Sequence, residues 1–402
     1  MFEGAETDIV IMGGCGHVGL PLGIALADSG LRVDLYDINA DVVALVNKGE
    51  MPFLELGAEE VLHRVIDQGM LQATDDRRTI GRAETVIVVI GTPIDEHLNP
   101  DPMAVRESIA NIASELVSGQ LLVLRSTVYP GVTRMVEGLI DDLALDIDIA
   151  FCPERIAEGK AMKELYELPQ IVASRSDRGQ ARAEKLFRRL TDNIVYLTPE
   201  EAELAKLFTN TWRYIKFATA NQLYMIANSY GLDFERIRHG LAEGYERAAD
   251  MPRAGFAAGP CLFKDTMQLA AFNNNNFTLG HAAMMINEGL PMYVVSQLER
   301  NWDLSEVSVG ILGMAFKSGS DDIRSSLSYK LKRVLAYRAK RVLCTDEYVT
   351  IDPDLRPLDD VLEQADLLII GAPHDRYADI ETIKPVVDIW NIRGNGVRVG
   401  PG

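Results

Sequence analysis

Short apolar runs alternate with longer stretches of helical periodicity through the first half of the chain. The first run covers residues 8–12, and a helical pattern at 20–29 follows it after a glycine-rich turn. Further strand-like runs are expected at 31–36, 85–90, 121–125, 148–151, 170–173 and 193–197. Because helical stretches separate most of these runs, the pattern predicts a parallel, doubly wound sheet.

A long helix is predicted in the middle of the chain. Residues Thr198-Pro199-Glu200-Glu201 form a capping box, in which Thr is the N-cap, Pro the first helical residue and Glu the third. The helical pattern then continues to residue 230, and Gly231 ends it. At 1.5 Å per residue the helix is a rod on the order of 45 Å long, enough to join two domains and to offer a dimer surface.

A new strand-and-glycine unit begins at residues 306–313, and strand-like runs recur at 341–345 and 366–371. The predicted fold class is therefore α/β, with two Rossmann-like doubly wound domains joined by a central helical domain that contains the long helix. We expect the domains to cover residues 1–198, 199–300 and 301–402.

Composition restricts the classes of partner. The chain has 402 residues, of which 47% are hydrophobic, and a net charge of −19, so nucleic acid is not an expected partner. Its four cysteines are widely spaced, which is typical of a reducing compartment. The sequence has no apolar run near the roughly 20 residues of a membrane helix, and its acidic N-terminus does not read as a signal peptide. We expect a cytoplasmic protein without a membrane partner.

A dinucleotide-binding turn follows the first strand. Gly14, Gly16 and Gly19 have the G-x-G-x-x-G spacing that brings backbone close to a pyrophosphate, with His17 and Val18 inside the turn. Asp37 follows the second strand, about 20 residues after the glycines. A carboxylate there accepts the ribose hydroxyls and repels a 2′-phosphate, so the cofactor predicted is NAD and not NADP. Cys15 is expected to be a small packed residue.

Polar residues also follow three later strands. Thr92 precedes Pro93, and Ser126 precedes Thr127, where doubly wound sheets bind ligands; capping of a helix is an equally weighted alternative for both threonines. The segment after the strand at 148–151 contains Glu154, Arg155 and Glu158. These carboxylates belong either to a solvated face or to a group that moves protons or positions a substrate.

The predicted long helix carries Lys206 and Asn210 one turn apart among apolar residues. An exposed helical lysine is the simpler interpretation of Lys206. The apolar neighbours of Lys206 and the paired Asn210 give equal weight to a second interpretation. In it, both side chains donate hydrogen bonds to a developing oxyanion.

Cys261 is the most informative residue of the middle segment. It follows a loop with Gly255, Gly259 and Pro260, and a helix is expected from residue 262 to 272. A thiol at a helix N-terminus is favoured as thiolate. Lys264 would add to this effect, and Asp265, one turn on, is a candidate base or water-holding group. The alternative, a buried hydrophobic cysteine, does not account for this setting.

In the third segment, residues 317–326 form a polar loop that enters a helix. Backbone amides together with Lys317 and Arg324 are suited to holding a phosphate. His374 and Trp390 are equally open to a structural and a functional interpretation.

Together these segments resemble the UDP-glucose/GDP-mannose dehydrogenase family, the nucleotide-sugar 6-dehydrogenases. The resemblance covers nearly the whole chain. It rests on the glycine turn, R-S-T at 125–127, P-E-R-x-x-E-G at 153–159, E-L-x-K-L-x-x-N at 203–210, G-P-C-L-F-K-D at 259–265 and G-M-A-F-K at 313–317. It implies an NAD domain, a central dimerisation domain, a nucleotide-sugar domain and a homodimer. The implied reaction consumes an NDP-hexose, two NAD and water, and yields an NDP-hexuronate and two NADH.

The resemblance also implies a role for single residues. Cys261 matches the family nucleophile, and Lys206 and Asn210 match its oxyanion-stabilising pair. Asp265 matches the base or water-holding carboxylate, and Thr127, Glu154 and Glu158 match groups around the reactive water and the sugar. At the substrate the matches are Arg155, Gly255, Phe256 and Lys317, and at the cofactor they are Thr92, Lys264 and Arg324. Arg247 matches an arginine that reaches across a dimer. No metal site is expected.

The loop before Cys261 differs from the G-F-G-G-S-C type usual in UDP-glucose enzymes. Gly259-Pro260 and Pro153-Glu154-Arg155 favour the N-acetylhexosamine branch, whereas Glu158 is a carboxylate which that branch often lacks. The substrate is therefore either a UDP-hexose or a UDP-N-acetylhexosamine. Two other functions remain as alternatives, a single-hydride β-hydroxyacid-type dehydrogenase and a non-catalytic nucleotide-sugar binder.

Overall fold

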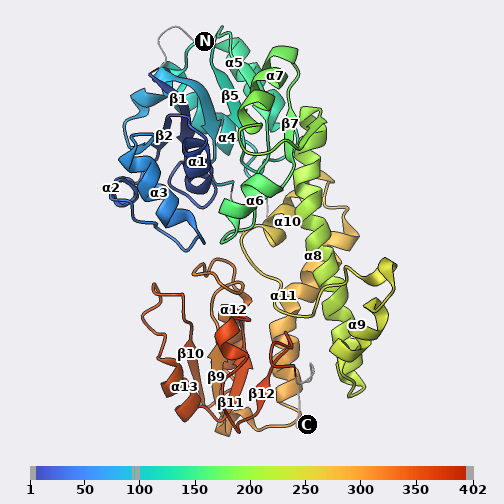
Figure 1. The fold of residues 1–402 in the computed structure, drawn as a ribbon. Coiled ribbons are helices and arrows are strands. Elements are labelled where there is room, and N and C mark those ends of the chain that lie inside the picture. The colour runs from blue at the N-terminus through green and yellow to red at the C-terminus, as the bar shows by residue number, and fades with distance from the viewer. Residues whose placement is uncertain (1–5, 93–94, 96–99, 395–402) are drawn as a thin grey trace. The chain divides into compact units, whose positions relative to one another are not determined.

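The computed structural model describes residues 6–92, 95 and 100–394. Pro93, which the sequence places next to Thr92 at the end of a strand, lies outside the described residues. The chain forms two compact units, Met1–Thr209 and Asn210–Gly402 (Figure 1). The three-domain division expected from the sequence stays a prediction. No helix among the described residues is both long and apolar enough to cross a bilayer.

The first unit is built on one mixed sheet with the strand order β3-β2-β1-β4-β5-β6-β7-β8 in its described part. The strands are β1 (Thr7–Met12), β2 (Val33–Tyr36), β3 (Leu71–Thr74), β4 (Ala83–Val88), β5 (Leu121–Leu124), β6 (Asp148–Phe151), β7 (Gln170–Ala173) and β8 (Ile194–Leu197). The helices are α1 (Gly19–Asp28), α2 (Ala40–Asn47), α3 (Ala58–Asp67), α4 (Ala104–Asn111), α5 (Val132–Asp142), α6 (Ala161–Glu167) and α7 (Asp177–Phe187).

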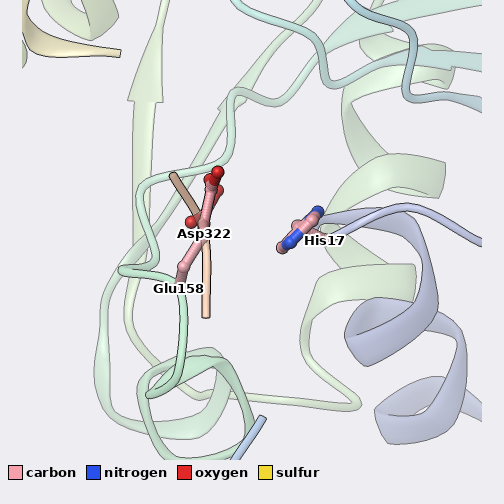
Figure 2. A group of neighbouring side chains, drawn as sticks. All are labelled: His17, Glu158 and Asp322. Atoms are coloured by element: carbon pink, nitrogen blue, oxygen red, sulfur yellow. The ribbon is translucent and has the colours of Figure 1, made fainter. Parts of the chain in front are cut away.

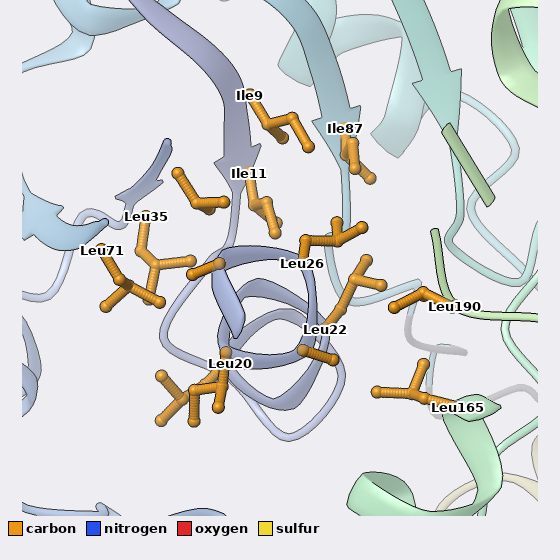
Figure 3. Packing of buried hydrophobic residues seen from close by; sticks show 14 of the residues in the cluster. Ile9, Ile11, Leu20, Leu22, Leu26, Leu35, Leu71, Ile87, Leu165 and Leu190 are labelled. Carbon is orange, nitrogen blue, oxygen red and sulfur yellow. The ribbon is translucent and has the colours of Figure 1, made fainter. Parts of the chain in front are cut away.

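Both faces of the central strands β1, β4 and β5 are largely buried, which explains why these strands are mostly apolar. Ile9 and Ile11 of β1 join the same apolar cluster as Leu22 and Leu26 of α1 (Figure 3). The alternate residues, such as Val10, belong to a second cluster on the opposite face. Successive side chains of a strand point to opposite faces, so one short run supplies both cores.

The prediction of a parallel sheet holds except at one pair of strands. The β6–β7 pair is antiparallel, with Phe151 opposite Ala173, and β8 is parallel to β7. The chain enters β7 from beyond the carboxyl end of β6, so β7 and β8 run against the other strands. The predicted strands occur within a few residues of their expected bounds, and β3 was not predicted from the sequence.

The long helix α8 (Pro199–Ser229) begins and ends as the sequence predicts. The backbone N–H of Thr198 donates to Glu201 Oε2 at 2.8 Å, and Glu201 N–H donates back to Thr198 Oγ1 at 3.4 Å. At the other end Gly231 adopts φ 67°, a conformation typical of a helix C-terminus.

A buried carboxylate fastens α8 to the N-terminus of α5. Glu203 is 1% exposed and accepts hydrogen bonds from Gly131 N–H (2.6 Å), Thr133 N–H (2.8 Å) and Thr133 Oγ1 (2.6 Å). The first amides of a helix have no partner within that helix and favour a negative charge. The side chain of Glu203 supplies both the acceptor and the charge.

The second unit combines helices with a parallel four-stranded sheet of order β10-β9-β11-β12. Its elements after α8 are α9 (Phe234–Ala242), η3 (Glu246–Ala248), α10 (Leu262–Phe272), α11 (Thr278–Leu298), β9 (Ser308–Leu312), α12 (Leu327–Leu335), β10 (Arg341–Thr345), α13 (Leu358–Gln364), β11 (Leu367–Ile370) and β12 (Val386–Val387). One apolar cluster joins α8, α11, α12 and β9, through Tyr224, Leu290, Leu331 and Ile311 among others.

We expect Glu203→Gln to lower the free energy of unfolding by about 2 kcal/mol, because charge-assisted hydrogen bonds to two helix amides become weaker or are lost. Urea denaturation followed by circular dichroism measures this loss. Glu201→Gln is the matched control, since it changes an exposed carboxylate of the same helix turn and should cost less than about 1 kcal/mol. Equal losses in the two variants would contradict the role given to Glu203.

Candidate active site

The glycine turn lies between β1 and α1, as the sequence predicts. A Cβ on Gly14 would lie 2.8 Å from Cα of Leu35 in β2, so only glycine lets the turn approach the neighbouring strand this closely. A Cβ on Gly16 would meet nothing closer than Gly13 O, at 3.6 Å. The backbone at Gly16 is therefore open to a ligand, which fits the pyrophosphate of a dinucleotide.

Asp37 is fixed at the end of β2. Its carboxylate accepts hydrogen bonds from Cys15 N–H and Asn39 N–H, both at 3.1 Å. This arrangement ties the carboxylate to the glycine turn, where a ribose would be recognised. Burial, followed by the charge of Asp37, raises the pKa of the Cys15 thiol to about 12, so Cys15 is not a nucleophile.

His17 and Glu158 approach one another within the first unit. Each offers a ligand atom within 4.8 Å of the other, and both side chains are half-buried (Figure 2). The His17 ring stacks on Phe53 with centroids 4.0 Å apart, which sets its orientation. Val18 is the N-cap residue of α1. Asp322, drawn in the same figure, belongs to the second unit. Two ligand atoms from one unit do not define a metal centre.

Carboxylates hold the loop at 152–161 that carries Glu158. Glu55, 6% exposed and distant in sequence, accepts from Gly159 N–H at 2.8 Å and Ala161 N–H at 2.7 Å. Glu164 accepts from Ala157 N–H at 2.7 Å. Sequence reasoning missed Glu55, because an isolated glutamate in a coil gives no signal of burial.

Glu154 takes part in the same support. Its carboxylate pairs with the fully buried Arg125, which also donates to Gln170 Oε1 at 3.1 Å, and it accepts from Arg155 N–H at 2.7 Å. The Arg155 guanidinium donates to Pro169 O, and its burial lowers the pKa of this group. These contacts give Glu154 and Arg155 a structural role, and the catalytic and substrate-binding roles expected for them stay predictions.

Thr92 and Thr127 connect the carboxyl ends of β4 and β5. Thr92 Oγ1 donates to the backbone oxygen of Thr127 at 2.6 Å, and Ser126 Oγ accepts from Ile90 N–H at 2.8 Å. Within the described parts of the chain neither threonine caps a helix, because the N-cap residues of α4 and α5 are Met103 and Gly131. The capping alternative is therefore wrong for both.

Cys261 occupies the N-cap position of α10, where the sequence predicts it, and is exposed. It differs in this respect from Cys15, Cys152 and Cys344, which are buried. Burial raises the pKa of the Cys152 and Cys344 thiols to about 12 as well. Cys261 is thus the thiol that the fold presents for reaction, and the alternative of a buried hydrophobic cysteine is wrong.

A charged cluster lies one turn after Cys261. Asp265 is fully buried, Asn210 Nδ2 donates to its Oδ2 at 2.6 Å, and Lys264 Nζ lies 3.2 Å from its Oδ1. Asp265 N–H donates to Cys261 O at 2.9 Å. The structure therefore brings together four of the predicted residues, with a carboxylate one helical turn from a thiol.

Lys206 belongs to the first unit and lies one turn of α8 before Asn210. Lys206 is only 8% exposed, so the interpretation as a solvated surface lysine is wrong. A lysine held in a largely buried position needs a specific partner or a function.

An asparagine organises the loop that precedes Cys261. Asn221 of α8 donates to Gly255 O at 3.0 Å and accepts from Gly255 N–H at 2.9 Å, which reproduces the pairing of a β-ladder. Asn221 also donates to Asn287 Oδ1 at 2.9 Å. Phe256 is 2% exposed, and its ring meets that of Trp390 edge-to-face with centroids 6.5 Å apart. Its ring is therefore packed in the interior, which leaves its backbone and not its ring as the part suited to contact a substrate. Sequence reasoning missed Asn221; a polar residue at a buried helix position is the signal that points to it.

The remaining candidates belong to other segments of the second unit. Lys317 follows β9, with its ammonium 5.3 Å from the ring centroid of Phe316. Arg324 forms an ion pair with Asp322, with Nη2 and Oδ2 2.7 Å apart. Arg247 is exposed in η3.

Comparison with known proteins gives matches to three domains of one family. The NAD binding, central and UDP binding domains of the UDP-glucose/GDP-mannose dehydrogenase family match residues 7–191, 200–289 and 310–395. A UDP-N-acetyl-D-mannosamine dehydrogenase of Pyrococcus horikoshii is 30% identical over 96% of this chain and 92% of its own.

Solved structures show the same fold. A UDP-D-ManNAc dehydrogenase structure from Pyrococcus horikoshii has a TM-score of 0.86 at 30% identity, over 93% of this chain and 91% of the other. A UDP-glucose dehydrogenase from Pyrobaculum islandicum has a TM-score of 0.89 at 25% identity, over 100% and 98% of the two chains.

Gly259→Ala should displace Cys261. Gly259 has φ 107°, and a Cβ there would lie 2.6 Å from Phe316 Cδ2, so we expect a loss of about 1–3 kcal/mol in stability. We also expect the alkylation rate of Cys261 by iodoacetamide, followed by mass spectrometry, to change severalfold. Gly240→Ala is the control, because a Cβ on Gly240 in α9 meets nothing within 4 Å. An unchanged alkylation rate in Gly259→Ala would show that the loop does not depend on this contact.

Proposed function

We propose, because the chain belongs to the UDP-glucose/GDP-mannose dehydrogenase family, that it oxidises the C6 alcohol of a UDP-sugar to the carboxylate with Cys261 as nucleophile. The chain is an NAD-dependent nucleotide-sugar dehydrogenase. The observation that carries the proposal is the exposed Cys261 thiol at the start of α10, one turn before the buried Asp265.

The steps balance as two oxidations and one hydrolysis. NAD held at the glycine turn and Asp37 would supply the hydride acceptor, with one NAD molecule for each oxidation. The C6 alcohol loses a hydride and a proton to give an aldehyde, and Cys261 Sγ adds to the aldehyde carbon to form a thiohemiacetal. Loss of a second hydride and a proton leaves a thioester. Water then adds to the thioester carbon and the C–S bond breaks, which releases the carboxylate and restores the thiol.

The residues near Cys261 suit the hydrolysis. Asp265 is positioned by Asn210 and Lys264, so its carboxylate is a candidate to take a proton from the attacking water. Amide and ammonium donors next to a reacting carbonyl stabilise the oxyanion that develops in each addition. Lys206 joins the proposal as a second such donor on the family resemblance and on its burial.

For the sugar we propose a UDP-N-acetylhexosamine, with UDP-N-acetyl-D-mannosamine as the first candidate. This choice is supported by the name of the Pyrococcus horikoshii relative and by Gly259-Pro260 before the nucleophile. UDP-glucose is the alternative, because the similar Pyrobaculum islandicum structure carries that name and because Glu158 is present.

Wild-type protein should form two NADH per UDP-sugar consumed, because the thiol carries the aldehyde to the acid. NADH absorbance against sugar loss, with UDP-N-acetylmannosamine, UDP-N-acetylglucosamine and UDP-glucose, gives this ratio and identifies the substrate. Cys261→Ser should lower kcat by about 10³-fold or more, as loss of a nucleophile does. NADH binding to the variant, measured by fluorescence, controls for folding. A ratio of one, or uronate formation by Cys261→Ser at a near-normal rate, would contradict the thioester route.

We also propose that the protein is a homodimer through α8 and α9. Trp212, Leu223 and Ile226 of α8 are between 38% and 58% exposed, and Tyr230 directly after the helix is 78% exposed. The spacings of 11 and 14 residues from Trp212 to Leu223 and Ile226 are near whole helical turns, so the three share one face. Leu241 of α9 adds a further exposed apolar side chain. Arg247, in η3 directly after α9, is then a candidate to reach the second copy.

Ile226→Glu should convert the dimer to monomer, because it places a charge in the centre of this face. Light scattering after size exclusion should give twice the 44.4 kDa of the chain for the wild type and 44.4 kDa for the variant. Ile351→Glu is the control, since Ile351 is 71% exposed outside these helices. A monomeric wild type, or a variant that stays dimeric, would exclude this face as the dimer interface.

A further inference from the structure

A buried aspartate organises the carboxyl edge of the sheet in the second unit. Asp346 directly follows β10, and its Oδ2 accepts from Met314 N–H at 2.6 Å and Ala315 N–H at 2.9 Å. Its Oδ1 accepts from Tyr348 N–H at 2.8 Å and Val349 N–H at 3.1 Å. One carboxylate thus joins the segment after β9 to the segment after β10.

His374, which follows β11, completes this arrangement. Its Nε2 lies 3.1 Å from Asp346 Oδ2, and Gly319 N–H donates to its Nδ1 at 3.1 Å. Because the amide of Gly319 can only donate, Nδ1 is the unprotonated nitrogen, and the proton of the neutral ring lies on Nε2 and points to Asp346. The two side chains are fully buried.

The charge state of Asp346 follows from these contacts. Burial by itself would raise its pKa, but the hydrogen bond from His374 and the backbone N–H groups outweigh burial and lower the pKa to about 2. Asp346 is therefore a charged carboxylate at neutral pH. A buried polar pair of this kind adds little stability relative to apolar packing, so its value lies in the conformation that it specifies.

That conformation belongs to the segment 314–319. It is held at Met314 and Ala315 by Asp346 and at Gly319 by His374, and Lys317 lies between the two attachments. The same segment reaches the cysteine loop, because Phe316 packs against Gly259. The two attachments therefore restrict the backbone position of Lys317.

We propose that His374 is a positioning residue for nucleotide-sugar binding. It acts through its bond to Gly319 N–H, with its ring oriented by Asp346, to hold the segment that presents Lys317 to the diphosphate of the substrate. This inference rests on the proposed function for the identity of the ligand.

Two substitutions separate the two bonds of His374. In His374→Asn the amide oxygen replaces Nδ1 and keeps the acceptor for Gly319 N–H, whereas in His374→Gln the amide nitrogen replaces Nε2 and keeps the donor to Asp346. We expect His374→Gln to raise the Kd for UDP and the KM for the nucleotide sugar about tenfold, the equivalent of one hydrogen bond. His374→Asn should raise both less than threefold, and kcat should change little in either variant.

Calorimetric titration with UDP measures the binding, and the same pair of substitutions at His63, an exposed residue of α3, is the control. Equal Kd values for His374→Gln, His374→Asn and wild type would overturn the inference, as would equal losses in the two variants. If the variants do not fold, hydrogen exchange of the wild type decides. Slow exchange of residues 314–319 without ligand supports a preformed segment, and fast exchange overturns it.

These outcomes differ from a failure of the proposed function. UDP titration needs neither NAD nor turnover, so an absent second NADH leaves the binding result intact. A wild-type protein that does not bind UDP overturns the nucleotide-sugar assignment and this inference together. Binding by the wild type with unchanged variants overturns this inference alone.

Discussion

Buried carboxylates that accept backbone N–H groups are the interaction on which the functional parts of this protein depend. The loops at the carboxyl ends of parallel strands have amides that no neighbouring strand can accept, and burying them without a partner is costly. Glu55, Glu203 and Asp346 each bind two or more such amides from segments distant in sequence. Each therefore satisfies the backbone and fixes the conformation of a loop in one step, which explains how glycine-rich segments are held without a ladder of their own.

In the loop before Cys261, neutral side chains and not carboxylates bind the backbone groups that have no partner in a sheet. Asn221 pairs with both backbone groups of Gly255, and Asn287 in turn accepts from Asn221. An amide is suited to this place because it both donates and accepts, whereas a carboxylate would leave Gly255 O without a donor. The charge of this region is concentrated instead at Asp265 and Lys264, one helical turn after Cys261.

Local sequence signals predicted the parts of the fold that local interactions determine. The capping box at Thr198, the end of α8 at Gly231 and the start of α10 after Cys261 depend on residues within a few positions, and all three are confirmed. The reversed direction of β7, the strand β3 and the bonds of Glu55 and Asn221 depend on segments far apart in the chain. No periodicity records such partners. For the site, motifs in the sequence pointed to candidate residues such as Cys261 and Asp265, but not to the side chains that hold their loops in place.

The segment after β9 connects the buried Asp346–His374 pair with the cysteine loop. Residues 314–319 are attached to the buried Asp346–His374 pair at both ends, and Phe316 between these ends packs on Gly259, two residues before Cys261. The segment expected to hold the diphosphate and the loop that carries the nucleophile are therefore in direct contact. Binding energy from an unreactive part of the substrate promotes catalysis only when it helps to position the reacting part. A rigid segment shared by the two provides this connection, because an imprecise diphosphate position would displace the loop of the thiol as well. Flexibility in residues 314–319 would thus cost affinity, which explains why the Asp346–His374 pair that holds this segment is fully buried.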